Sequence, residues 1–137
     1  MMVFILLCGK TNAQNTDSVT FSGKYHNNEY NIYLEVNLKE KNILVAGQEI
    51  LGELDGYFSS TKTSHIWAIT SSEINGNTAT IDVVNNYGSE DFTACLVFKD
   101  EKTIEFKHLK GSTFKFPVDK KWQKLPTKMI FEKNEIY

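Results

Sequence analysis

Hydrophobic positions in this chain alternate with polar ones, which is the two-residue period of a β-strand with one buried face. In residues 32–38 the apolar side chains occupy every second position and would point to one side of a sheet. No stretch of ten or more residues shows convincing helical periodicity. The pattern therefore predicts an all-β chain, with further alternating segments at residues 79–84, 92–98, 104–108, 114–116 and 129–132.

Turn-forming residues separate these segments at the spacing of β-hairpins. Asn75-Gly76 is the strongest signal, because both central residues of a type I′ turn need a positive φ and these two residue types tolerate it. Eight to ten short strands joined by tight turns indicate a single-domain antiparallel meander. A closed up-and-down barrel removes exposed sheet edges, whereas a β-sandwich only protects them, so we expect the barrel.

Residues at the start of the first predicted strand resemble the corresponding residues of a known family of barrels. Phe21 and Gly23-Lys24-Tyr25 resemble the glycine-plus-aromatic opening of lipocalin-like barrels. Tyr25 stands where that family has Trp, and the other motifs of the family are missing from the chain. The resemblance covers five residues; it implies the same up-and-down barrel and assigns no residue a role.

Residues 1–13 have the features of an export signal. An apolar run is followed by Thr11 and Ala13, small residues that fit the minus-three and minus-one positions of a signal peptidase site. Cleavage after Ala13 would leave residues 14–137 as one β domain, which is enough chain for a single core. We therefore expect a periplasmic or secreted protein.

Anchoring as a lipoprotein through Cys8 is the alternative, although Leu7 stands where a small residue is preferred. No apolar run approaches the roughly 20 residues of a transmembrane helix. Removal of residues 1–13 would also leave Cys95 without an intramolecular partner, as a thiol buried in an apolar strand.

Charge narrows the choice of partner. All 15 basic residues are Lys, and the net charge is −2. Because the planar guanidinium of Arg is the usual reader of phosphates and guanine edges, its absence argues against a nucleic-acid partner. Residues 14–98 carry a net −7 and residues 99–137 a net +4. The basic residues 99–137 would suit an acidic partner or an anionic surface. An ordinary solvent-exposed face of a sheet would contain the same excess of lysines.

Candidate catalytic chemistry is sparse. His26, His65 and His108 lack the spacing of metal ligands, and we predict neither a metal nor another cofactor. His26 is expected in a turn, and His108 as a partly buried, hydrogen-bonded residue. The carboxylates of Glu53 and Asp55 share one strand face, where a solvated surface is the default. The chain has no nucleophile elbow, phosphate loop or dinucleotide motif, so we expect no enzyme.

Two polar loops that carry aromatic residues are the better candidates. Residues 58–64 lead into His65 and Trp67, which share a strand face, and residues 85–91 place Tyr87 at a loop tip. Exposed loop aromatics often anchor partners. The predicted ligand- or partner-binding residues are Phe58, His65, Trp67, Tyr87, Glu90 and Asp91.

Trp122 lies between Pro117 and Pro126, which interrupt sheet pairing. We expect this segment to leave the meander and fold back, with the indole as a structural plug over one end of the barrel.

These observations predict an exported, noncatalytic module that binds a protein partner, for example as an inhibitor or immunity protein. The alternative is a barrel that carries a small apolar ligand, although a barrel of about eight strands is just wide enough to be filled by side chains. A hydrolase is a third possibility, without an identifiable nucleophile or base.

Overall fold

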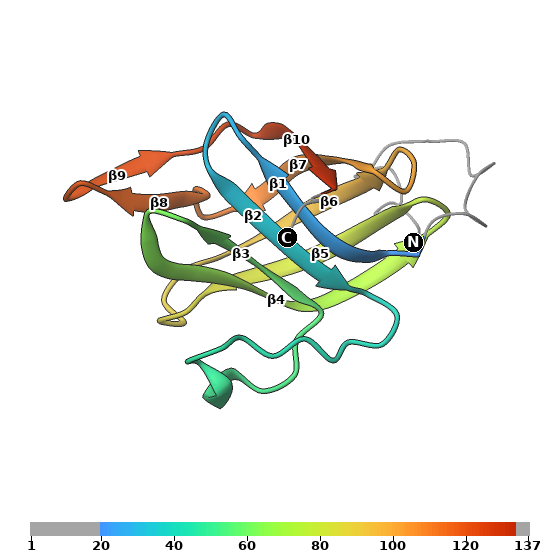
Figure 1. Ribbon diagram of the computed structural model, residues 1–137, viewed down its shortest axis with the longest axis horizontal. Coiled ribbons are helices and arrows are strands. Elements are labelled where there is room, and N and C mark those ends of the chain that lie inside the picture. The colour runs from blue at the N-terminus through green and yellow to red at the C-terminus, as the bar shows by residue number, and fades with distance from the viewer. Residues whose placement is uncertain (1–19, 134–137) are drawn as a thin grey trace.

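The alternating segments form ten β-strands in the computed structural model, which describes residues 20–133 (Figure 1). One short 3₁₀ helix and no α-helix occur among these residues. The elements are β1 (Ser22–Asn27), β2 (Ile32–Asn37), η3 (Glu49–Leu51), β3 (Gly56–Ser60), β4 (Thr63–Asn75), β5 (Thr78–Asn85), β6 (Asp91–Phe98), β7 (Thr103–Gly111), β8 (Lys115–Val118), β9 (Lys121–Lys124) and β10 (Lys128–Lys133).

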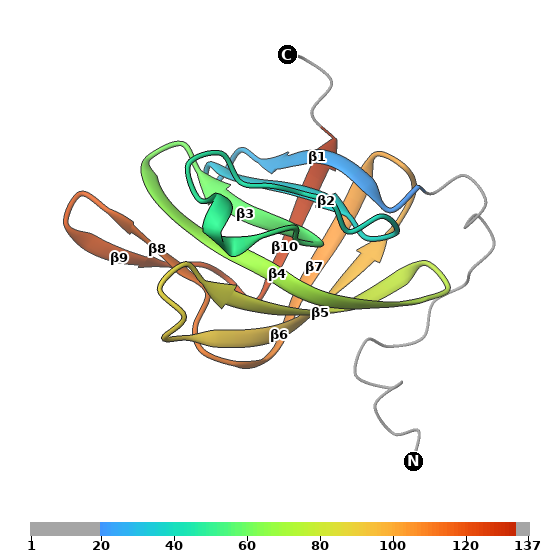
Figure 2. The ribbon, with the colours of Figure 1, turned by 90° about the horizontal axis from the view of Figure 1, so that it is seen from below.

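Eight strands close into an antiparallel barrel in the order β1-β10-β7-β6-β5-β4-β3-β2, which confirms the predicted barrel. Each strand pairs with its neighbour in the chain, except that β8 and β9 form a separate two-stranded hairpin between β7 and β10. Figures 1 and 2 show this hairpin extending beyond the barrel at the end that also carries the β3–β4 turn and the β5–β6 loop. The predicted signal, residues 1–13, lies outside the described residues.

The β4–β5 turn lies one residue later than predicted. Asn75 pairs with Thr78, so the two central residues are Gly76 and Asn77 rather than Asn75 and Gly76. Gly76 has a φ of 67°, and Asn77 is not among the residues with positive φ. A positive φ at the first central residue alone fits a type II′ turn, in which Gly is favoured at that position.

Aromatic rings fill the interior of the barrel. Phe114 lies 4.9 Å from Phe58, 5.0 Å from Phe92 and 5.3 Å from Phe106, measured between ring centroids. These four side chains have at most 2% of their surface exposed. Trp67 is fully buried beside them, and its indole N–H donates a 2.8 Å hydrogen bond to the backbone oxygen of Lys115. The bond ties β4 to the start of the β8–β9 hairpin.

The predicted excursion near the two prolines is confirmed, but the predicted plug is wrong. Trp122 is 53% exposed, whereas Phe114 and Phe116 are buried in the core. Alternation explains the difference, because Trp122 pairs with Pro117, and Phe116 belongs to the opposite face of the hairpin. The chain therefore plugs this end with β8 and leaves β9 exposed, from Lys121 to Lys124.

The long β2–β3 connection covers the outer face of β3 and β4. Val45 and Leu54 from this loop pack with Ile66 and Ala68 in a second apolar cluster. Asp55 anchors the end of the loop and is 4% exposed, which corrects the expectation of a solvated carboxylate. It accepts hydrogen bonds from the Lys41 ammonium at 2.8 Å and from the Ser72 hydroxyl at 2.6 Å.

Cys95 is disulfide-bonded in the structure of the full chain. The predicted unpaired thiol concerns the chain after cleavage, which this structure does not test. That prediction assumed a chain beginning at Gln14, from which the other cysteine of the sequence had been removed.

Candidate functional site

An aromatic cluster lies at the barrel end beside the β8–β9 hairpin. His65, near the start of β4, is its centre, and the ring centroids of Tyr87 and Trp122 each lie 5.6 Å from that of His65. Phe116 and Trp67 contact the imidazole from the core side, at 5.8 and 5.9 Å. Tyr87 is 75% exposed and Trp122 53%, while His65 is 4% exposed. A buried imidazole thus connects two exposed aromatic side chains from different elements.

The imidazole has an unsatisfied polar atom. Nε2 of His65 is buried and has no hydrogen-bond partner among the described residues. Buried polar atoms without a partner are rare in native structures and often mark functional positions.

An ion pair completes the cluster. The Lys115 ammonium lies 3.2 Å from a carboxylate oxygen of Glu90 and 5.2 Å from the centre of the Trp122 ring. Lys115 therefore connects β8 to the β5–β6 loop and holds one face of the indole by a cation–π contact. The two charges neutralise each other beside His65.

The β5–β6 loop is hydrogen-bonded to Asn85, the last residue of β5. Asn85 is 6% exposed, and its side-chain oxygen accepts hydrogen bonds from the backbone N–H groups of Ser89 (3.0 Å) and Glu90 (3.4 Å). The backbone N–H of Asn86 donates to the oxygen of Ile66 on β4 at 3.1 Å. These bonds present Tyr87 in a fixed position before any partner arrives, which lowers the entropy lost on binding.

The predicted site residues divide into two groups. His65, Tyr87 and Glu90 come together at the barrel end. Asp91 begins β6 with an exposed side chain, and its backbone oxygen accepts a 2.8 Å hydrogen bond from Ser112. Phe58 and Trp67 have no exposed surface, so a protein partner has no access to them and we remove them from the candidate site.

The sequence predicts Trp122 as a plug, with the binding site as its role if the indole is exposed, and assigns no role to Lys115. A signal for Trp122 was present, because β9 reads Lys121-Trp122-Gln123-Lys124 and gives the indole no apolar companion on its own strand face. No sequence pattern indicated a role for Lys115, because its ion-pair partner Glu90 lies on a loop far away in the sequence.

Burial lowers the pKa of His65 below its ordinary value of 6.5; Lys115 lowers it further, and Glu90 opposes the shift. The unfolded chain therefore takes up a proton at higher pH than the folded protein. The free energy of unfolding should decrease as the pH falls below about 6.5, by at most about 1.4 kcal/mol per pH unit from this group, and should not change above it.

Denaturant unfolding between pH 7.5 and 5.5 measures this effect. His65→Gln removes the titrating group and should have a flatter profile than the wild type over this range. An identical pH profile for both proteins would show that the neutral form of His65 is not favoured by folding.

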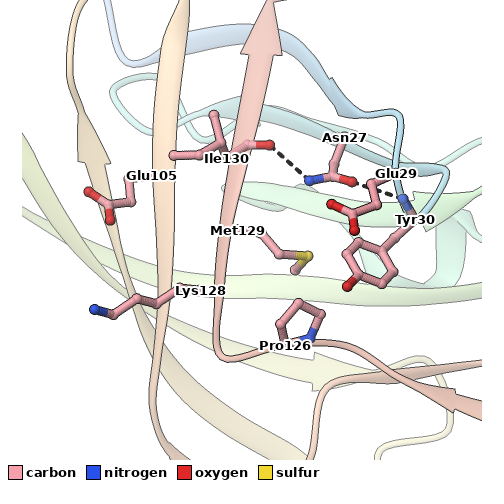
Figure 3. Close-up of a pocket in the computed structure, with 8 residues that line it drawn as sticks. All are labelled: Asn27, Glu29, Tyr30, Glu105, Pro126, Lys128, Met129 and Ile130. Carbon is pink, nitrogen blue, oxygen red and sulfur yellow. Dashed lines mark hydrogen bonds between the residues drawn. The ribbon is translucent and has the colours of Figure 1, made fainter.

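Surface grooves also lie away from the cluster. One, of about 400 Å³, lies where the β1–β2 turn separates from β10 (Figure 3). The side-chain amide of Asn27 bridges this gap, donating to the backbone oxygen of Ile130 at 2.9 Å and accepting from the N–H of Tyr30 at 2.9 Å. The lining of this groove also includes Glu29, Glu105, Pro126, Lys128 and Met129.

Another groove, of about 170 Å³, includes Tyr57 and Glu35. Burial, together with Glu35 and a 3.1 Å hydrogen bond to it, raises the pKa of Tyr57 to about 12. The phenol therefore stays neutral and is not poised as a general base.

The remaining histidines add no reactive centre. His26 lies in β1 rather than in a turn, and its ring centroid is 6.0 Å from that of Tyr33. His108 is half-buried with Nε2 2.8 Å from the oxygen of Ser112, as predicted. Within residues 20–133, no group of three His, Cys, Asp or Glu side chains is arranged to hold a metal ion.

Ser72 is not an activated nucleophile, although it contacts both Lys41 and Asp55. The Ser72 hydroxyl donates to the carboxylate of Asp55, and the Lys41 ammonium donates to the Ser72 oxygen at 2.9 Å. A lysine that donates its protons in this way is not available to accept one.

In the part of the chain that the structure describes, no helix is long and apolar enough to cross a membrane. Comparison with protein-family models, with curated proteins and with solved structures gave no match.

Proposed function

We propose that this protein is an exported, noncatalytic module that binds a protein partner, as inhibitors and immunity proteins do, through the barrel end that carries Tyr87 and Trp122. The observation that supports this most is the exposure of both aromatic side chains on either side of buried His65. Tyr and Trp are the residues that most often dominate the energy of protein interfaces.

The scaffold supports this use. Trp122 is held by Lys115, and Tyr87 lies on a loop fixed through Asn85, so both anchors are preorganised. The proposed export rests on the sequence of residues 1–13.

The filled interior favours a protein partner over a small apolar cargo. Phe58, Phe106 and Phe114 occupy the centre of the barrel with ring centroids 4.9–5.7 Å apart. A carrier would need an apolar pocket of several hundred cubic ångströms in that place.

Affinity capture from the extracytoplasmic fraction of the native host tests the proposal. Wild-type protein should retain a specific protein, and Trp122→Ala should weaken its binding about 30-fold, the effect of losing a hot-spot residue worth about 2 kcal/mol. Tyr87→Ala should also weaken binding of the captured protein. Ile50→Ala is the matched control, because Ile50 is 96% exposed and lies in η3.

Trp122→Ala should cost less than about 1 kcal/mol of unfolding free energy, as ordinary surface substitutions do. Loss of binding will therefore not reflect unfolding. Equal capture by wild type, Trp122→Ala and Tyr87→Ala would contradict the proposal.

A further inference from the structure

The β8–β9 hairpin concentrates positive charge around Trp122. Residues 115–124 contain four lysines and one aspartate, in a chain whose net charge is −2. Lys115 is neutralised by Glu90, whereas Lys120, Lys121 and Lys124 are exposed. These three lysines and Trp122 define the basic hairpin surface, which extends beyond the barrel in Figures 1 and 2.

The turn of this hairpin holds a lysine in an unfavourable conformation. Val118 pairs with Lys121, which leaves Asp119 and Lys120 as the two central residues, with φ values of 52° and 68°. A type I′ turn needs a positive φ at both positions, and Gly is the residue that adopts it without steric cost at the second. The chain instead has Lys120 there, so a basic side chain is placed at the tip at the expense of backbone strain. Backbone strain of this kind clusters at functional sites, although Phe21 and Lys41 also have a positive φ in this chain.

We propose that the basic hairpin surface docks against an acidic face of the protein partner, with the indole of Trp122 entering an apolar depression surrounded by carboxylates. This rests on the proposed function and specifies the chemistry of the partner. A buried aromatic anchor with a charged rim is the usual arrangement of an interface, and the rim charges mainly set the association rate and its salt dependence.

The surroundings of the hairpin favour a discrete acidic patch over a broad anionic membrane. Asp119 lies at the hairpin tip, and Asp91 lies next to the neighbouring β5–β6 loop, at the start of β6. A continuous anionic surface would meet these carboxylates together with the lysines. An acidic patch on a protein can be narrow enough to contact the three lysines without also facing these carboxylates.

Fluorescence titration of the full chain with poly-L-glutamate tests the proposal. Trp122 is exposed and Trp67 buried, so a change in emission that disappears in Trp122→Phe reports contact at the hairpin. We expect binding at 20 mM salt that weakens at least tenfold at 200 mM. Replacing the three lysines together, by Lys120→Gly, Lys121→Gln and Lys124→Gln, should weaken it at least tenfold.

The matched control carries Lys39→Gln, Lys99→Gln and Lys102→Gln, which remove the same charge from exposed positions at the opposite end of the barrel (Figure 1). It should bind within twofold of the wild type. Lys120→Gly alone should not lower the melting temperature, because it relieves the positive-φ strain.

The proposal is overturned if poly-L-glutamate leaves the Trp122 emission unchanged, or if the control weakens binding as much as the hairpin variant. Vesicles of phosphatidylcholine and phosphatidylglycerol (3:1) that bind through the same lysines, when poly-L-glutamate does not, would also overturn it in favour of a lipid surface. If the polymer fails while capture of a protein still depends on Trp122, the proposed function stands and only the acidic nature of the partner is wrong.

Discussion

Replacing Phe114 by Ala is expected to lower the free energy of unfolding by about 3–5 kcal/mol, the range for large aromatic residues in tightly packed cores. Phe114 is 1% exposed and contacts five aromatic rings; Phe92, Phe106 and Phe116 are three of them. Because it enters the barrel from the segment between β7 and β8, it also attaches the hairpin to the core. Its loss should therefore loosen the base of the candidate site as well as leave a cavity.

Chemical denaturation measures the loss, with Phe114→Leu as the control that keeps most of the volume. Leu should cost less than half as much as Ala, because it fills more of the space. A loss below about 1 kcal/mol for Phe114→Ala would mean that the neighbouring rings close over the gap and that the core does not depend on Phe114.

The substitution Gly111→Ala is expected to cost about 2–4 kcal/mol. Gly111 has a φ of 106°, and a Cβ built there would lie 2.6 Å from the Cα of Phe92 and 2.8 Å from the oxygen of Asp91. Backbone strain of about 1–3 kcal/mol therefore adds to a clash with main-chain atoms that cannot move aside independently. Gly111 ends β7 at the point where the chain turns towards Phe114.

Gly47→Ala is the matched control, because Gly47 also has a positive φ, 82°, but nothing lies within 4 Å of the added Cβ. It should lose only about 1 kcal/mol, the part due to backbone conformation. Thermal or denaturant unfolding of both variants separates the two contributions. Equal losses would show that crowding at Gly111 is relieved by local movement.

The barrel could be predicted because alternation and turn residues act locally. Residues 32–37 form a strand with the expected alternating burial, since a two-residue period needs no knowledge of the partner strand. Residues 92–98 also form a strand with the expected face buried, but Cys95 and Val97 on its other face are buried too. The turn at Gly76 was misplaced by one position because Asn75-Gly76 and Gly76-Asn77 both satisfy turn chemistry, and only the pairing of β4 with β5 selects between them.

The site was harder to predict, because it depends on contacts between distant elements. Phe58 and Trp67 adjoin a polar turn in the sequence, and only the closed barrel shows that both side chains point inwards. Phe116 and Trp122 are both large aromatics on one hairpin, and the docking of β8 against β4 decides which one is buried. Such choices depend on long-range packing, for which a single sequence has no local signal.

The first and last strands of the described chain close the barrel. Within residues 20–133, β1 pairs with β10 through Tyr25 with Lys133 and His26 with Glu132. These two strands come from opposite ends of the described chain, so their pairing has the largest loop-closure entropy and completes the sheet after the local hairpins have formed.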